Sequence, residues 1–149
     1  MEANRIADLP ASIRGYPYGW QIAIPAEMGT LLGHPVTVNF DTRSTPGKEP
    51  PPVVTPDEAD LAATILARFG EVLREVEARF TEACERHRDD GLEQIASPHV
   101  WICRDDPEKA GTRHWAFAIE RRTPHAVHGD YVTLVEFDGL TFLRVWSGS

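Results

Sequence analysis

The sequence predicts an α+β domain, in which a mainly antiparallel sheet of about six strands has one long helix packed across one face, in the order ββαββββ. Apolar and polar residues alternate in two segments before residue 41 and in four after residue 99. Between them, apolar residues recur at spacings of three and four, which is typical of an amphipathic helix. A length of 149 residues fits one domain, so we expect residues 1–149 to fold as a single unit.

The first two predicted strands lie near the N-terminus. Residues 20–24 alternate between apolar and polar side chains, as a strand with one buried face does. Residues 34–40 show the same alternation, with Val36, Val38 and Phe40 on one face. We expect the two strands to pair as a hairpin.

A proline-rich segment and a helix start follow. Residues 42–54 hold four prolines, which lack a backbone donor, so this segment is interpreted as an extended connector. Thr55 is a helix cap, Pro56 suits the first helical position, and Glu58 stands three residues after the cap. Together they predict a capping box.

One apolar stripe follows this start for about 32 residues. At 1.5 Å per residue such a helix would span roughly 48 Å, which is longer than a typical strand. We therefore expect it to bend at Gly70, and to stop at Gly91. The stripe consists of Leu61, Ile65, Phe69, Val72, Val76, Phe80 and Cys84.

The last third of the chain predicts four strands. Residues 100–103 and 114–120 alternate, and residues 131–137 and 140–146 flank Asp138–Gly139, a two-residue hairpin signal. This last hairpin is apolar on both faces. Because one helix covers only one side of a sheet, the connector, the N-terminal arm or a second copy of the protein must shield the other side.

Aromatic residues of these strands form a candidate interaction surface. Counting outward from the two-residue turn places Tyr131, Phe142 and Trp146 on one face of the hairpin. Together with Trp101 they could form an aromatic patch for a ligand or a protein partner. Trp115 we expect in the core, because aromatic rings dominate core burial.

The segment 120–130 is the richest in groups that could carry chemistry. His125, His128 and Asp130 could bind a divalent metal, or a histidine could act as a general base. Solvated loop histidines are the favoured interpretation, because a loop lacks the fixed geometry of a helix. The two cysteines, Cys84 and Cys103, show no paired ligand spacing and are expected to be buried free thiols.

The predicted helix carries most of the net charge of −8, since residues 56–90 hold ten acidic and five basic side chains. Glu75 with Arg79 and Glu82 with Arg86 stand in the order that favours ion pairs along a helix, so a solvated, self-stabilising face is the favoured interpretation. The alternative is a docking surface for a basic partner, formed by residues such as Glu71, Glu75 and Glu82.

Five segments in order, 19–25, 33–40, 55–58, 115–117 and His128–Gly129, resemble a family of small bacterial domains of unknown function. Some members of that family are suspected toxin-immunity proteins. The resemblance implies an immunity-like interaction role and carries no catalytic residues with it.

Composition and missing motifs exclude several classes of function. A sequence pI of about 5.2 disfavours binding to nucleic acid. Glycine-rich phosphate loops, nucleophile elbows and paired metal-ligand motifs are not found in the sequence, so we expect no cofactor. An uninterrupted apolar leader is also missing, which predicts a cytoplasmic protein without membrane contact. Thirteen arginines against two lysines suggest a bacterial source by composition.

The sequence therefore favours a non-catalytic protein-interaction module whose partner is another protein, with a homodimer also expected through the uncovered face of the sheet. A small metal-dependent or histidine-based enzyme using segment 120–130 is the alternative. A small-ligand binder, with its pocket between the sheet and the helix, is a lesser alternative.

Overall fold

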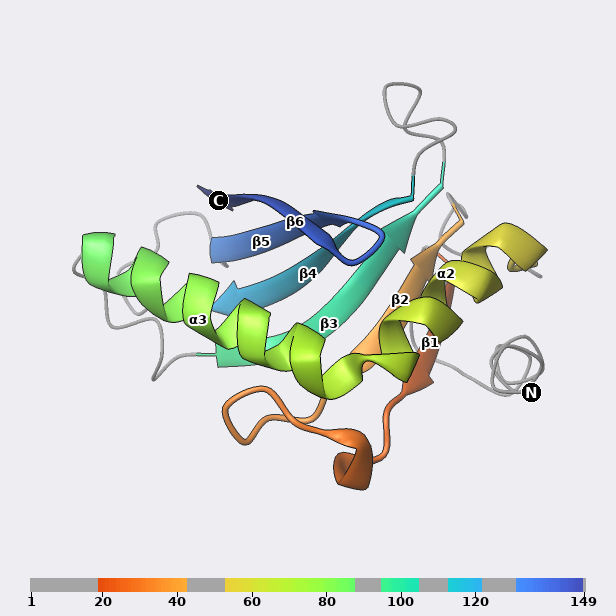
Figure 1. Ribbon diagram of the computed structural model, residues 1–149, viewed down its shortest axis with the longest axis horizontal. Coiled ribbons are helices and arrows are strands. Elements are labelled where there is room, and N and C mark those ends of the chain that lie inside the picture. The colour runs from red at the N-terminus through yellow and green to blue at the C-terminus, as the bar shows by residue number, and fades with distance from the viewer. Residues whose placement is uncertain (1–18, 43–52, 88–94, 105–112, 122–130, 149) are drawn as a thin grey trace.

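A computed structural model of the chain describes residues 19–42, 53–87, 95–104, 113–121 and 131–148. Six strands form one sheet, and two helices lie across one of its faces (Figure 1). The α+β class and the mainly antiparallel sheet expected from the sequence are confirmed. His125, His128 and Asp130, and most of the predicted connector 42–54, lie outside the described residues.

The strands lie side by side in their order along the chain. Neighbouring strands are antiparallel except for the second and third, which run parallel, so the sheet is mixed. A parallel pair requires a long crossover, and the helices supply it. The strands are β1 (Gly19–Ala23), β2 (Thr37–Asp41), β3 (Ile95–Cys103), β4 (His114–Arg121), β5 (Tyr131–Asp138) and β6 (Thr141–Gly148).

The single long helix expected from the sequence is wrong: the segment forms two helices, α2 (Pro56–Ala67) and α3 (Phe69–His87). They are separated at Arg68, whose φ of −122° and ψ of 32° are not helical. The expected bend at Gly70 is therefore also misplaced, because Gly70 lies inside α3. With a short 3₁₀ turn, η2 (Ala26–Met28), between β1 and β2, the element order becomes ββααββββ.

The break lets both helices keep an apolar face on the twisted sheet. Leu61 and Ile65 of α2 and Val76 and Phe80 of α3 belong to one buried cluster together with sheet residues. A straight helix of the combined length would lose contact with the sheet at one of its ends. Two shorter helices follow the twist instead, and α3 crosses the sheet diagonally in Figure 1.

Trp115 lies in this core, as expected. Only 1% of its surface is exposed, its ring stacks on Phe137 at 4.6 Å with 8° between the planes, and its indole N–H donates to the carbonyl of Gly139 at 2.7 Å. The indole is thus buried and its N–H has a hydrogen-bond acceptor. These contacts hold β4 and the end of β5 together beneath α2 and α3.

The hairpin of β5 and β6 has a different register from the one counted from the sequence. Asp138 pairs with Thr141 and Phe137 with Phe142, so the turn lies at Gly139 and Leu140. The register then shifts, and Glu136 pairs with Arg144. A bulge of this kind moves every following side chain to the other face. Arg144 and Trp146 therefore lie on the opposite face from Phe142.

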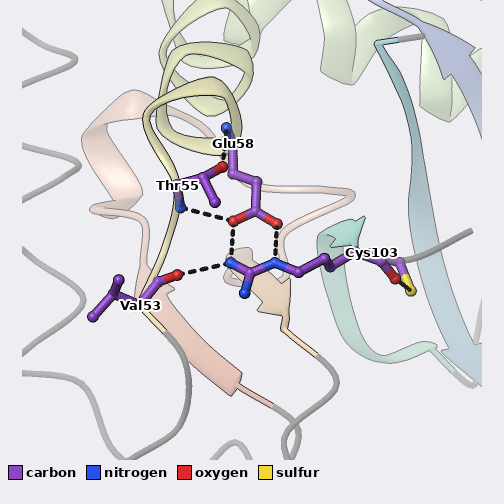
Figure 2. A network of polar contacts seen from close by, with 5 residues as sticks. Val53, Thr55, Glu58 and Cys103 are labelled. Atoms are coloured by element: carbon purple, nitrogen blue, oxygen red, sulfur yellow. Dashed lines mark hydrogen bonds and ion pairs between the residues drawn. The ribbon is translucent and has the colours of Figure 1, made fainter. Parts of the chain in front are cut away.

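A polar network joins the start of α2 to the end of β3 (Figure 2). The predicted capping box is present: Glu58 N donates to Thr55 Oγ1 at 3.2 Å, and Thr55 N donates to Glu58 Oε1 at 2.8 Å. Arg104 donates from Nε to Glu58 Oε2 at 3.1 Å, from Nη2 to Glu58 Oε1, and from Nη2 to the carbonyl of Val53 at 2.7 Å. One carboxylate thus caps the helix and binds a strand end.

Neither described helix has the length and apolar character that crossing a membrane requires. Cys84 and Cys103 are not joined by a disulfide, and only Cys84 is buried as expected. Cys84 lies buried in the core cluster, and Cys103 ends β3 with intermediate exposure.

Candidate interaction surface: the open face of the sheet

The helices leave the second side of the sheet uncovered by any described helix, and we call this side the open face. Two rows of side chains cross it from β1 to β6 in register, and within them Asn39, Ala116, Ala118 and Glu136 are almost fully buried. The first row is Gln21, Asn39, Trp101, Ala116, Glu136 and Arg144. The second row is Ala23, Thr37, His99, Ala118, Leu134 and Trp146.

Glu136 is the central charged group of the open face. Its side chain is 6% exposed, His114 Nε2 lies 2.8 Å from Glu136 Oε1, and Arg144 Nε donates to Glu136 Oε2 at 2.7 Å. Burial on its own would raise the pKa of this carboxyl, but hydrogen bonds from Arg144 and His114, together with their charges, lower the pKa below its ordinary value. Glu136 is therefore ionised, and its carboxylate holds the imidazole of His114 and the guanidinium of Arg144 in place.

Asn39 plays a similar organising part on β2. Its side-chain oxygen accepts from Gln21 Nε2 at 3.0 Å and from Thr37 Oγ1 at 2.8 Å, and the residue is almost fully buried. A buried amide oxygen with two donors is satisfied and held in one orientation. The polar groups of the open face are thus ordered at β1–β2 as well as at β4–β6.

His99 lies between these two groups, next to a bulge in β3. The register of β3 with β4 shifts between Ala96 and His99, and Ser97 has a φ of +47°. This geometry brings the carbonyl of Ser97 to 2.8 Å from His99 Nδ1. Burial lowers the pKa of His99, while that carbonyl and the charge of Glu120 oppose the shift. His99 is therefore neutral near pH 7.

The predicted aromatic patch is divided by the structure. Trp101 on β3 and Trp146 on β6 share the open face, with β4 and β5 between them. Phe142 lies on the helix side, where its ring meets Phe137 edge-on at 6.1 Å and Arg79 of α3 lies 3.9 Å above it. Tyr131 begins β5 and pairs in register with Arg121.

The acidic residues predicted as a docking surface on the helix are mostly engaged within the chain. Glu71 binds Arg68 at 3.3 Å, and Glu75 binds Arg79 at 2.9 Å. Glu82 is exposed on α3 and has an interaction of its own. The pairing of Glu75 with Arg79 agrees with the sequence interpretation of a self-stabilising face.

Two further acidic side chains of the helices are also engaged. Asp60 binds Arg113 at 3.1 Å, and Glu77 accepts from the amide of Leu32 at 2.9 Å. Both contacts join a helix to a segment that is distant in the sequence. Most of these acidic side chains of α2 and α3 therefore already have partners within the chain, so they are less suited to bind a basic partner protein.

The described residues offer no metal site, since no three histidine, cysteine or carboxylate groups among them come together as a cluster that could hold an ion. Glu120 stands near the end of β4, and the remainder of segment 120–130 lies outside the described residues apart from Arg121. The metal and general-base hypotheses for His125, His128 and Asp130 remain predictions.

Sequence reasoning missed His114, Glu136 and Arg144 as a group. A signal for it exists: Glu136 is the only charged residue between Tyr131 and Phe137 in an otherwise apolar strand, and a buried carboxylate requires partners. Comparisons of the chain with protein-family models, with curated proteins and with solved structures found no match.

Proposed function

We propose that this protein is a non-catalytic protein-interaction module that binds its partner through the open face of the sheet. The observation that carries the proposal is the hydrogen-bonded group of His114, Glu136 and Arg144 on β4 to β6, on the same face as Trp101 on β3 and Trp146 on β6. Tryptophan and arginine are the residues most enriched at the energetic centres of protein interfaces.

Order in the free protein supports this role. Glu136 and Asn39 each hold two neighbouring side chains by hydrogen bonds, so the polar groups of the face lose little conformational entropy when a partner binds. Arg144 keeps 70% of its side chain exposed while its Nε is anchored on Glu136. A partner can therefore meet a fixed guanidinium next to an exposed indole.

The chemistry of the open face suits a protein more than a nucleic acid. Arg144 is the one arginine or lysine in the two rows of described residues, and it is paired with Glu136, so the face lacks the cluster of cations that binds phosphates. An immunity-like role, which the sequence resemblance implies, would make the partner a protein toxin. Binding without catalysis is sufficient for such a role.

Photo-crosslinking from two positions tests the proposal. A benzoylphenylalanine residue would replace Trp101 on the open face in one variant and Arg74, which is exposed on α3, in the other. In cells that express the protein, we expect a discrete adduct from position 101 and none from position 74. Mass spectrometry of the adduct then identifies the partner and tests the immunity-like role.

Binding measurements with that partner complete the test. Trp101→Ala should weaken the complex by about tenfold or more, as truncation of a central aromatic does, whereas Arg74→Ala should change the Kd less than about twofold. Adducts formed only from position 74, or equal losses for both alanine variants, would contradict binding through the open face.

A further inference from the structure

β6 is an edge strand with an unusually apolar surface. It ends the order of the sheet, so its outer backbone groups pair with no strand in the described part of the chain. Three of the large hydrophobic residues most exposed among the described residues, Leu140, Leu143 and Trp146, lie on β6 or in the turn before it, each 45–49% exposed. An edge of this kind is a template for another strand.

The usual protections of an edge strand are weak here. β6 contains no proline and no lysine, and its one charged residue, Arg144, forms an ion pair with Glu136 of its own chain. A bulge lies near Leu143, but the residues from Arg144 to Gly148 continue in regular register with β5. This regular stretch can accept a second strand.

The sequence of the edge is complementary to itself. Two antiparallel copies related by a two-fold axis place residues of the same sheet face opposite each other. Arg144 and Trp146 share the open face, so pairing centred on Val145 puts each Arg144 opposite Trp146 of the second copy. Pairing centred on Arg144 would instead oppose two guanidinium groups.

We propose that two copies of this chain pair through β6 in the register centred on Val145, which joins their sheets into one. Each Arg144 then lies between its own Glu136 and Trp146 of the second copy, and the guanidinium contacts the indole face in a cation–π interaction that occurs twice. The ring of Trp146 lies over Gly148 of its own strand, where a β-carbon would come within 2.8 Å of it, so glycine leaves room for the indole there.

The second copy is favoured over an unrelated peptide because the strand itself supplies both halves of the contact. The ion-paired Arg144 and the exposed Trp146 lie two residues apart on one face. The two-fold axis therefore forms the contact between Arg144 and Trp146 of the other copy twice. This inference uses Arg144 and Trp146, which also belong to the open face, but self-association tests it and binding to another protein tests the proposed function, so the two can fail separately.

Charge substitutions at residue 146 test the pairing by sedimentation equilibrium. The wild type should be a dimer at about 100 µM, a concentration at which even weak dimers are populated. Trp146→Lys places an ammonium group opposite Arg144 of the second copy and should weaken dimerisation by about tenfold or more. Trp146→Glu places a carboxylate there instead and should retain the dimer.

Val53→Lys is the matched control, because Val53 is 75% exposed and its carbonyl accepts from Arg104 beside the end of β3, which lies three strands from β6. It should leave the dimer unchanged, and circular dichroism should show that all three variants are folded. A monomeric wild type, or equal dissociation of the Lys and Glu variants at residue 146, would overturn the proposed register.

Discussion

The guanidinium of Arg104, one residue beyond β3, binds both carboxylate oxygens of Glu58, in the first turn of α2. The side chains are only 22% and 12% exposed, so solvent screens the pair less than it screens a surface ion pair. Glu58→Ala removes this pair and half of the capping box together, and should lower the free energy of unfolding by about 2–3 kcal/mol.

Urea denaturation measures this loss, and the helix offers a matched control. Glu71 binds Arg68 at 3.3 Å with both side chains about 60% exposed, so Glu71→Ala should cost about 0.5 kcal/mol or less. Equal effects of the two substitutions would show that the Arg104 contact does not strengthen the capping box.

Glu136 should give the protein an acid-sensitive stability. Its pKa is lowered in the folded state, so as the pH falls below about 4.5 the unfolded chain takes up a proton before the folded chain does. The free energy of unfolding should therefore fall through this range. Glu136→Gln should cost about 1–3 kcal/mol at pH 7 and markedly less at pH 3, measured by urea denaturation at both pH values.

His99 should affect the stability of the protein at a higher pH than Glu136 does. Burial lowers its pKa below 6.5, so the unfolded chain takes up this proton first, and stability conferred by neutral His99 is lost as the pH falls from 6.5 towards the folded-state pKa. NMR should show the imidazole of His99 titrating below pH 6.5. In His99→Gln, the free energy of unfolding should fall less between pH 6.5 and 5 than it does in the wild type. An equal fall in both proteins would show that other groups cause it.

Gly70 offers a stabilising substitution. A β-carbon at this position meets only Arg74 Nη1, at 3.8 Å, and Gly70 is the second residue of α3, so Gly70→Ala should raise the free energy of unfolding by about 0.5 kcal/mol. Gly29→Ala is the contrast, because its β-carbon would lie 2.5 Å from Leu73 Cδ1 at a φ of +144°, and it should lose about 1–3 kcal/mol. Thermal unfolding compares them.

The features that sequence reasoning placed correctly depend on local chemistry. Thr55 and Glu58 form a capping box from neighbouring residues alone, and alternation along β4 puts Trp115 in the core. The helix break at Arg68 was not predicted, because that residue is neither glycine nor proline. We attribute the break to the packing of the helices on a twisted sheet, which no local sequence signal marks.

The candidate surface was harder to predict for a related reason. The bulge that turns Arg144 and Trp146 to the open face is created by cross-strand pairing, so counting from Asp138–Gly139 could not reveal it. The contact of Glu136 with Arg144 depends on that same register, whereas its contact with His114 depends on the pairing of β4 with β5. Alternation identifies which strands exist, and the bulges decide which residues share a face.

The one parallel contact in the sheet has a consequence for folding kinetics. Strands β3 to β6 are joined by successive antiparallel pairings, whereas β2 meets β3 only by bringing Thr37 beside His99 across the whole α2–α3 crossover. Closing so long a loop is entropically slow, so the β3–β6 meander should form first and the β1–β2 hairpin should dock last. Backbone amides of β1 should then exchange with solvent by a lower-energy opening than those of β4.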